Sequence, residues 1–507
     1  MKVAFINEAD QHVGIQYLTA MLKAHGHDVK TFSDPRLFND LYITLPKLNK
    51  IFDYQDSIIK EIAEFNPGLI GFSVSSPIYQ WACAFAAKIK KRLNIPIIFG
   101  GVHPTAVPER VIQKEYVDMI CVGEGEFPLL ELVNSMDRGQ IDYTIPNLWF
   151  KTGQGEIIKN GIRPLIPDLD ALPLPDQDLF YSSSSYDTKS YVTMISRGCP
   201  HSCSYCTMSY LHDLYQGKGK RIRHRSVRNV IDEISGILKT HKNIKRIMFP
   251  DNCFGTDIAW LREFSREYSR EIGLDFFCVM HPASVNQEAI ACLKAAGCRS
   301  ISLGIQSWDS QLRHDMLTRR VSNEIMENAL KLIQDSGIEL LIDNLFDFPE
   351  YSMEKFIESL DIYTRYKPTR NYFYKLHFYP GTKLSQIAVQ HHWITASQYE
   401  DCLEGGDTLG ILRYNASQEN NPNRQNRESK QAQILFVLMD LIPAGWTRVI
   451  IQKKWYRYFP PFLNPALLTM FRTLLANDFE SRYFKDITFW RYGYFIKKKI
   501  KFYFKKK

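Results

Sequence analysis

The sequence predicts an α/β protein that begins with a doubly wound parallel sheet, continues as a partial (β/α)6 barrel and ends in a helical region. The chain has 507 residues, a length that suits about three domains. Residues 1–140 and 191–395 both alternate apolar strand-like segments with amphipathic helical ones, which is typical of parallel sheets covered by helices. The remaining parts are predicted to be a linker with a hairpin, 141–190, and a helical C-terminal region, 396–507.

Composition and charge exclude several classes of protein. Apolar residues make up 45% of the chain and charged residues 23%, as in a globular protein. The net charge of +8 is carried by residues 491–507, which hold one arginine, seven lysines and no acidic residue, so a nucleic-acid groove across the body is not expected. No run of about 18 apolar residues predicts a transmembrane helix. The chain starts with a strand-like segment and its cysteines are dispersed, so a cytoplasmic protein without a disulfide framework is expected.

The first 140 residues contain short strands that alternate with helical segments. At residues 14–25, for example, Leu18, Met21 and Leu22 share one face of a predicted helix that ends at Gly26. The predicted strands are Lys2–Ile6, Asp28–Phe32, Gly68–Val74, Pro96–Phe99 and Val117–Val122. Because ligands of such sheets bind beyond the carboxyl ends of the strands, the residues that follow the strands form the candidate site.

Small and polar residues follow three of these strands. They are Ser73 and Ser75, then Gly100 and Gly101, then Gly123, Glu124 and Gly125. Glycine at a strand end lets a flat or bulky ligand approach the backbone. A lone Gly-Gly after a strand is most often only a turn, but three such ends on consecutive strands predict a ligand site.

The sequences GGVHPT at residues 100–105 and GEGE at 123–126 resemble the cobalamin-binding domain at the front of the B12-dependent radical SAM enzymes. The resemblance implies that the strand-end residues named above contact cobalamin. In cobalamin-dependent mutases and methionine synthase, a D-x-H-x-x-G motif supplies a histidine to the cobalt, and DQHVG at 10–14 is one residue short of it. His12 is therefore a candidate cobalt ligand. The alternative is an ordinary loop histidine, with water or no ligand below the cobalt.

Residues 141–190 are predicted to be a connector, with a hairpin at 147–158 and an extended link marked by prolines. Six βα units then suggest an incomplete barrel, whose reactive ends are the carboxyl ends of its strands. The predicted strands are Tyr191–Ile195, Arg246–Phe249, Asp275–Met280, Ser300–Leu303, Glu339–Asn344 and Tyr372–Phe378.

Three cysteines follow the first strand of the predicted barrel. Cys199, Cys203 and Cys206 form a C-x3-C-x2-C array, and thiolates at such short spacing hold metal rather than pair with one another. Three thiolates suit a [4Fe–4S] cluster with one iron left open. The alternatives are a zinc site completed by His201 and a structural cluster without catalytic function.

The same array, with Tyr205 before the last cysteine, resembles the signature of radical SAM enzymes. The resemblance implies that the amine and carboxylate of S-adenosylmethionine (SAM) chelate the open iron, and that one electron cleaves SAM to a 5′-deoxyadenosyl radical. It also implies SAM contacts at the cysteine loop and at the ends of the barrel strands. These contacts are Tyr205, Asp251, Gly304, Gln306, Ser307 and Pro380. Arg319 or Arg320 is a further candidate for binding a carboxylate, with a solvated arginine pair as the alternative.

The end of the chain mixes aromatic and basic residues. In residues 489–507, Trp, Tyr and Phe suit the bilayer interface, and the lysines attract anionic headgroups. Peripheral contact with the inner face of a membrane is our hypothesis for this tail. A solvated basic terminus and RNA contact are the alternatives.

The resemblance predicts a radical SAM enzyme with a [4Fe–4S] cluster, SAM and cobalamin as cofactors. We expect methyl transfer to an unactivated carbon of a small-molecule or lipid substrate, with flavodoxin or ferredoxin as electron donor. The first alternative is an oxidative or ring-forming enzyme of the same group, resembling the anaerobic cyclase of the chlorophyll pathway. The second is a non-catalytic cobalamin-sensing or partner-binding protein, against which the intact cysteine array argues.

Overall fold

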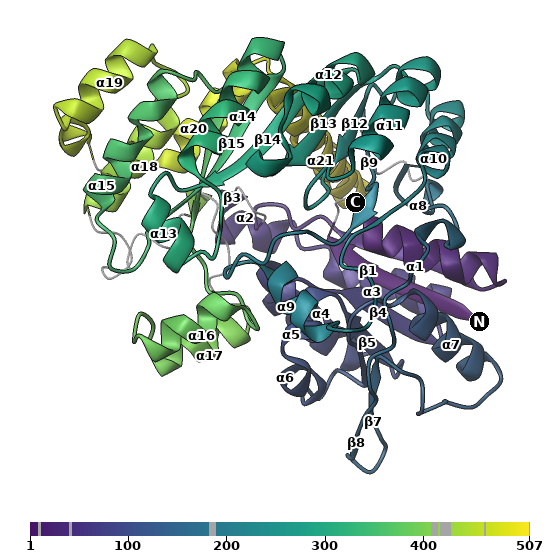
Figure 1. The fold of residues 1–507 in the computed structure, drawn as a ribbon. Coiled ribbons are helices and arrows are strands. Elements are labelled where there is room, and N and C mark those ends of the chain that lie inside the picture. The colour runs from purple at the N-terminus through teal and green to yellow at the C-terminus, as the bar shows by residue number, and fades with distance from the viewer. Residues whose placement is uncertain are drawn as a thin grey trace.

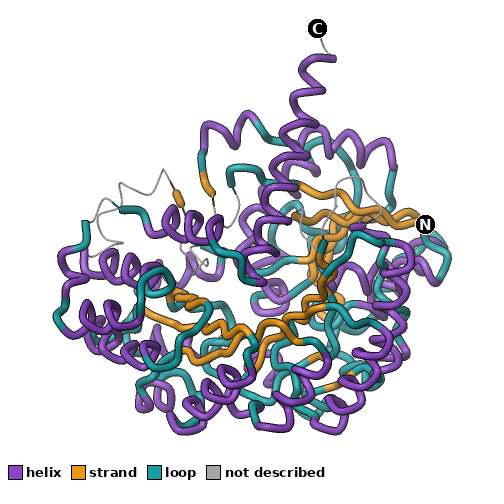
Figure 2. The backbone as a smooth tube through the Cα atoms, turned by 90° about the horizontal axis from the view of Figure 1, so that it is seen from above, coloured by secondary structure: helices purple, strands orange, loops and turns teal. Residues whose placement is uncertain are grey.

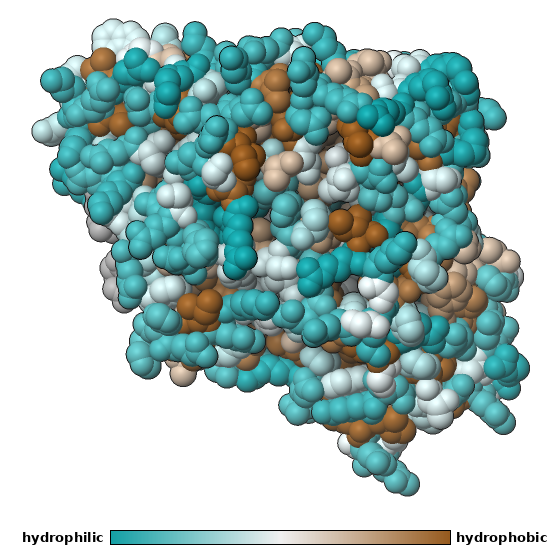
Figure 3. All heavy atoms as spheres, in the orientation of Figure 1, coloured by the Kyte–Doolittle hydropathy of each residue, from teal (hydrophilic) through white to brown (hydrophobic). Residues whose placement is uncertain are grey.

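The computed structural model describes residues 1–8, 12–39, 43–181, 189–406, 414–415, 427–460 and 463–505. Two α/β domains lie against each other, and helices of the C-terminal region pack on both (Figure 1). In the view of Figure 1 the N-terminal domain lies below and the barrel above. The face shown in Figure 3 is mostly hydrophilic, with hydrophobic side chains in small scattered groups.

The N-terminal domain is built on a seven-stranded sheet in the order β2-β1-β4-β5-β6-β7-β8. The parallel strands are β1 (Lys2–Glu8), β2 (Asp28–Asp34), β4 (Leu69–Ser73), β5 (Ile97–Gly100) and β6 (Met119–Cys121). They confirm the predicted doubly wound sheet. The predicted linker hairpin, β7 (Leu148–Lys151) and β8 (Ile157–Lys159), extends this sheet at its antiparallel edge. It joins the domain because Leu148 and Phe150 are buried in the domain core.

Helices cover both faces of this sheet. α1 (Val13–Ala24) and α7 (Glu126–Asp137) pack together on one face, and α3 (Gln55–Phe65) and α4 (Tyr79–Lys90) pack on the other. The connecting elements are β3 (Ile43–Thr44), α2 (Pro46–Ile51), η1 (Ser76–Ile78), α5 (Val102–Ala106), α6 (Pro108–Ile112), η2 (Leu169–Ala171) and α8 (Asp178–Tyr181). Because both faces are covered, the strand ends are the part of the sheet left for a ligand.

The second domain is a half-barrel of six parallel strands in the order β16-β15-β14-β13-β12-β9. Figure 2 shows the strands as an open arc with helices along its outer side. The strands are β9 (Ser190–Val192), β12 (Arg246–Phe249), β13 (Asp275–Met280), β14 (Cys298–Gln306), β15 (Glu339–Phe346) and β16 (Arg370–Lys375). The helices are α9 (Thr207–Leu214), α10 (Val227–Thr240), α11 (Ile258–Glu271), η3 (Pro282–Ser284), α12 (Gln287–Ala296), α13 (Ser310–Asp315), α14 (Asn323–Ser336), α15 (Met353–Ser359) and η4 (Leu360–Thr364). The predicted partial (β/α)6 barrel is confirmed.

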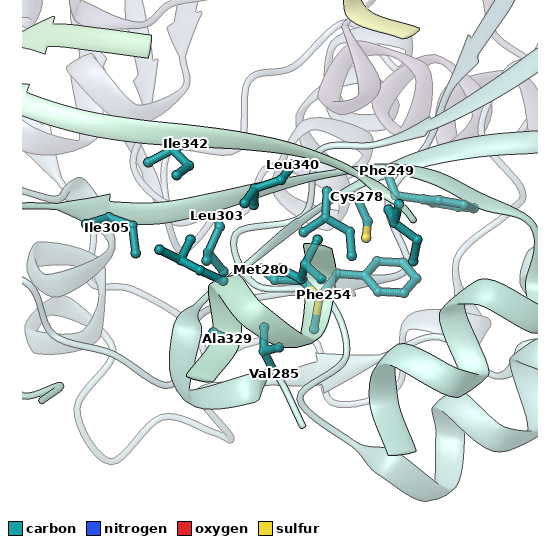
Figure 4. Close-up of a cluster of buried hydrophobic side chains, with 14 of the residues drawn as sticks. Phe249, Phe254, Cys278, Met280, Val285, Leu303, Ile305, Ala329, Leu340 and Ile342 are labelled. Carbon is teal, nitrogen blue, oxygen red and sulfur yellow. The ribbon is translucent and has the colours of Figure 1, made fainter. Parts of the chain in front are cut away.

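The main core lies between the strands and the outer helices (Figure 4). On β14, Ile301, Leu303 and Ile305 are fully buried in this core, whereas Ser300 and Ser302 alternate with them. The alternation follows from the two-residue period of a strand, which sends successive side chains to opposite faces. Each buried Leu, Ile or Phe contributes roughly 1.5–3 kcal/mol.

The first barrel strand is shorter than predicted. The sequence predicts a strand to Ile195, but β9 ends at Val192. The chain then leaves the sheet, and β10 (Ser196–Arg197) pairs antiparallel with β11 (Arg223–His224). The cysteine array therefore follows β10, in the connection between β10 and β11, rather than the barrel strand itself.

The C-terminal region is helical, as predicted, and its last helix connects the two domains. After α16 (Lys383–Gln390), which ends the predicted barrel segment, the elements of this region are α17 (Ala396–Leu403), β17 (Tyr414–Asn415), α18 (Arg427–Leu438), α19 (Ala444–Gln452), η6 (Trp455–Tyr458), α20 (Pro465–Leu475) and α21 (Phe479–Lys505). Phe479 packs on Met248, Phe277 and Leu341 of the barrel strands. Further along α21, Phe495 is buried in the N-terminal core, and its carbonyl accepts a 2.5 Å hydrogen bond from the Tyr54 hydroxyl.

The tail predicted to contact a membrane is thus partly used for packing. Tyr492 packs edge-on against Phe38, and Phe495 is buried, while Lys497 and Lys498 are exposed. The side chains of Phe489, Trp490 and residues 501–507 lie outside the described part. The end of α21 projects from the body (Figure 2). None of the helices in the described ranges combines the length and apolar composition needed to cross a bilayer.

Candidate active site between the two domains

A cavity of ≈ 480 Å³ opens between the N-terminal domain and the cysteine loop of the barrel. The strand ends of the first sheet form one wall, and residues of the β10–β11 hairpin and of α9 form the other. The first wall includes Ser73, Gly100, Gly101, Gly123, Glu124 and Gly125, and the second includes Met194, Arg197, Gly198, Met208, Leu211, Tyr215 and Arg223. The strand-end residues predicted to contact a ligand therefore meet at one cavity, with the exception of Ser75, which is not in its lining.

Glycine is required at two positions of the first wall. Gly101 has φ +101, and a Cβ there would lie 2.7 Å from the backbone N and O of Val74. Gly123 has φ +84, and a Cβ there would lie 1.9 Å from the Tyr215 hydroxyl oxygen. A larger residue at either position would strain the backbone, and one at Gly123 would also push Tyr215 of the other wall away, so the cavity depends on these glycines.

His12 lies between β1 and α1, in the loop where the sequence predicts it. It is the N-cap of α1, where its Nδ1 accepts a 3.4 Å hydrogen bond from the backbone N–H of Ile15. Burial lowers the pKa of His12 to about 4, so the imidazole is neutral. His12 is not in the lining of the cavity. Asp10 and Gln11, the other part of the predicted motif, lie outside the described residues.

The cysteine loop is held on both sides by the barrel. The backbone N–H of Ser204 donates to the Leu317 carbonyl at 3.0 Å, and the Ser204 carbonyl accepts from the N–H of Leu384 at 2.9 Å. Cys206 then begins α9 as its N-cap residue. Burial raises the pKa of Cys199 to about 12 and also raises the pKa of Cys206. These thiols are therefore neutral at pH 7 unless a metal binds the thiolate form.

Arg319 connects the cysteine loop to the end of β14. Its Nη1 lies 3.6 Å from the Sγ of Cys203, and its Nη2 donates to the carbonyl of Gly304. Gln306 ends the strand with φ +70, and its amide nitrogen would lie 3.0 Å from a Cβ at Gly304. Arg319 thus links Gly304 to Cys203, and Gln306 lies beside Gly304. Of the two candidate arginines, Arg319 is buried and Arg320 is exposed.

The other predicted SAM contacts have hydrogen bonds or packing within the protein. Asp251 is buried and accepts hydrogen bonds from the backbone N–H groups of Ile195 and Ser196 at 3.2 and 2.8 Å. Burial raises the pKa of this carboxyl to about 6. The Ser307 hydroxyl accepts from the Asp309 N–H at 3.2 Å, Tyr205 packs on the barrel core, and Pro380 is buried. In this structure Asp251 therefore braces the strand before the cysteine loop.

A half-buried histidine within the array, His201, contacts the buried His281, and the sequence did not indicate this contact. The rings of His201 and His281 stack with centroids 3.6 Å apart. Burial lowers the pKa of His281 to about 2, so this ring is neutral. Within the described ranges, no three His, Cys, Asp or Glu side chains are grouped so that they could hold a single metal ion. A [4Fe–4S] cluster differs from such a site because each of its three thiolate ligands binds a different iron, so the ligands need not converge on one point.

Comparison with known proteins supports both halves of this site. Residues 10–133 match the model of the B12 binding domain, and residues 193–362 match the model of the radical SAM superfamily. The chain is a radical SAM enzyme with a B12-binding domain. It is 28% identical over 395 residues to an uncharacterized methyltransferase of Pyrococcus horikoshii, covering 75% of this chain and 79% of the relative. It is 23% identical to the anaerobic magnesium-protoporphyrin IX monomethyl ester cyclase of Rubrivivax gelatinosus, over 97% of this chain and 83% of that protein.

Solved structures share the fold. The radical S-adenosylmethionine methyltransferase TsrM of Kitasatospora setae, with cobalamin and a [4Fe–4S] cluster bound, superposes with a TM-score of 0.62 at 18% identity, over 77% of this chain and 78% of that one. The cobalamin-dependent radical enzyme OxsB with aqua-cobalamin bound gives a TM-score of 0.65 at 15% identity, over 96% and 75%.

The residues of this radical SAM enzyme fit the cofactors of the two domain types. At the strand-end glycines the cavity is bordered by backbone rather than by side chains, and most of its surface is apolar, which suits a flat corrin ring. Three cysteines on one loop, with Gln306 and Arg319 beside them, suit a cluster and the polar end of SAM. Gly198 lines the cavity and directly precedes Cys199, so the two cofactor sites are neighbours.

Proposed function

We propose that this radical SAM enzyme transfers a methyl group from SAM to an unactivated carbon of a small-molecule substrate, with cobalamin as the methyl carrier. One observation carries the proposal: a single cavity is lined both by the strand ends of the B12-binding domain and by the loop that holds the cysteines. When bound, the cluster supplies the electron that cleaves SAM, and cobalamin supplies a transferable methyl group.

The residues of the chain have separate roles in this proposal. Cys199, Cys203 and Cys206 hold the cluster, and Gly304 and Gln306 offer a backbone carbonyl and a side-chain amide to SAM. The backbone of residues 100–101 and 123–125 faces the corrin ring. Phe5, Leu18, Met194 and Leu211 line the cavity and exclude water from it, which protects reactive intermediates.

An anaerobic assay that requires no known substrate tests this proposal. The protein is reconstituted with iron and sulfide, supplied with hydroxocobalamin and methyl-labelled SAM, and reduced either chemically or by flavodoxin, the electron donor that we propose beside ferredoxin. We expect 5′-deoxyadenosine and a labelled methyl group on the cobalamin. Cys206→Ala should abolish the 5′-deoxyadenosine. If the wild-type protein with a full cluster cleaves no SAM, the proposal is wrong.

A ring-forming reaction is the second candidate function. The cyclase of Rubrivivax gelatinosus matches 97% of this chain, including the C-terminal region, whereas the Pyrococcus horikoshii methyltransferase matches 75%. The two candidate functions differ in the mass of the product. Methyl transfer adds the label and one methyl group to the substrate, whereas ring formation adds no label.

We also propose that the end of α21 contacts anionic membrane surfaces, which would suit a lipid substrate. Its exposed lysines support this proposal, each contributing on the order of 1 kcal/mol near such a surface. A truncated protein that ends at Ile496 retains the packing of Tyr492 and Phe495 and loses the lysines. We expect the full chain, but not the truncated one, to float with phosphatidylserine vesicles. Equal flotation of both proteins would contradict the proposal.

A further inference from the structure

The β10–β11 hairpin, which carries the cysteine array, is attached to both domains. β10 is two residues long and is followed directly by Gly198 and Cys199. Ser196 faces the barrel, where its backbone N–H and hydroxyl donate to Asp251 Oδ1 at 2.8 and 2.6 Å. The next residue, Arg197, points the other way, as strand alternation requires, and reaches the B12-binding domain. The position of Cys199 therefore depends on contacts in two domains.

The hairpin contains a repulsion that the other domain relieves. Arg197 and Arg223 are direct cross-strand partners, and like charges opposite each other destabilise a strand pair. Glu124 of the B12-binding domain accepts from both, at 3.3 Å from Arg197 Nη1 and 2.8 Å from Arg223 Nη2. Glu126 accepts from Arg197 Nη2 at 2.6 Å. We call these four side chains the interdomain lock.

The interdomain lock is buried enough for its charges to matter. The side chains of Arg223, Glu126, Glu124 and Arg197 are 5%, 7%, 16% and 21% exposed. Burial by itself raises the pKa of Glu124, but the hydrogen bond from Arg223 and the two arginine charges outweigh it, so the pKa lies below its usual value. Two positive and two negative charges balance. Removing one charge would leave a partner buried without compensation, which is strongly unfavourable.

Both halves of the interdomain lock also line the cavity. Glu124 lies in the strand-end loop of the first wall and Glu126 begins α7 directly after it, while Arg197 and Arg223 belong to the hairpin of the second wall. The backbone N–H of Ile166 holds Glu124 Oε2 at 2.9 Å, which fixes the carboxylate at the domain boundary. A ligand that fixed the strand-end loop would therefore also fix β10, directly before Cys199, and a cluster at Cys199 would fix the loop in return.

We propose that the interdomain lock couples cobalamin binding in the cavity to cluster assembly at Cys199, with Arg197, Arg223, Glu124 and Glu126 as positioning residues. This inference rests on the proposed function, in that cobalamin occupies the cavity. Because coupling between two sites is reciprocal, each cofactor tightens the binding of the other by the same factor.

Equilibrium dialysis of hydroxocobalamin tests the coupling without an activity assay. The Kd is measured for the reconstituted protein and for a cluster-free variant in which all three array cysteines are Ala. We expect the cluster to lower the Kd by about tenfold in the wild type. In Glu124→Gln, which keeps the side-chain shape and loses the charge, we expect the two Kd values to be nearly equal. Glu131→Gln is the matched control. Glu131 also accepts two hydrogen bonds from an arginine, Arg163, at 3.0 and 2.7 Å, but this ion pair does not involve the hairpin.

Three results would overturn the coupling. They are equal Kd values in the wild type with and without the cluster, an unchanged ratio in Glu124→Gln, and a ratio lost equally in the Glu131→Gln control. If Glu124→Gln does not fold, Arg197→Met tests the same lock from the other domain. The ratio of the two Kd values in the wild type is measured independently of either variant. Failure of hydroxocobalamin to bind in any state would overturn both proposals. A tenfold ratio without methyl transfer would overturn the proposed function alone.

Discussion

Replacing Gly198 by Ala, which adds a single methyl group directly before Cys199, should disrupt the cysteine loop. Gly198 has φ +98, and a Cβ there would lie 1.7 Å from the carbonyl oxygen of Arg221. Carbon–oxygen contacts are ordinarily about 3.3 Å or longer, so the two chain segments must separate by about 1.5 Å. The separation occurs directly beside the β10–β11 pair, in which Arg197 opposes Arg223.

The magnitude follows from two costs. The left-handed backbone costs a non-glycine residue about 1–2 kcal/mol. Loss of two backbone hydrogen bonds in the hairpin costs about 1 kcal/mol each. Gly217→Ala is the matched control, because Gly217 has φ +74 but nothing lies within 4 Å of its Cβ position, so only the backbone cost remains. Gly198→Ala should therefore exceed its control by about 2 kcal/mol, which lowers the population of the competent loop roughly 30-fold.

Iron content after anaerobic reconstitution measures this difference. The expected order is wild type, then Gly217→Ala slightly below it, then Gly198→Ala with little bound iron, while far-ultraviolet circular dichroism remains the same for all three. If Gly198→Ala binds as much iron as Gly217→Ala, the steric reasoning about the hairpin is wrong.

Three further predictions concern single residues of the site. Burial raises the pKa of Asp251 from its ordinary value of 3.8 to about 6, so the folded state binds the proton more tightly and the stability from this group falls as pH rises from about 4 to 6. Asp251→Asn should remove up to about 3 kcal/mol of this pH dependence in urea titrations, and parallel profiles for the two proteins would contradict it. His12→Ala should cost about 1 kcal/mol through the lost N-cap yet leave the visible spectrum of bound cobalamin unchanged, and a shifted spectrum would instead identify His12 as a cobalt ligand. Gly101→Ala should weaken hydroxocobalamin binding, because the positive φ of Gly101 costs a non-glycine residue about 1–3 kcal/mol and the new Cβ would meet the Val74 backbone. Gly139→Ala is the control, since Gly139 has φ +78 and open space at its Cβ position, and it should leave the Kd unchanged. Equal Kd values for the two variants would refute this.

Much of the fold was predictable because its signals are local. Strands such as Ile97–Gly100 are short apolar runs, helices such as Val227–Thr240 repeat apolar residues every three to four positions, and both patterns depend only on neighbours in the sequence. The β10–β11 hairpin was missed for the same reason, since two-residue strands show no period. The bridging role of α21 was missed because its contacts at Phe479 and Phe495 belong to two different domains.

The candidate site divides in the same way. By itself the sequence determined the cysteine array, the glycines of the strand ends and Gln306, because residue type and spacing within a few positions define these features. Only the tertiary structure decided that His12 caps a helix, that Asp251 braces β10, and that Arg319 rather than Arg320 reaches Cys203. The interdomain lock is also a tertiary feature, since Glu124 and Arg197 are 73 positions apart and meet only when the two domains pack. Burial decides these roles, because a charged or polar side chain enclosed by protein must find its partners wherever the fold supplies them.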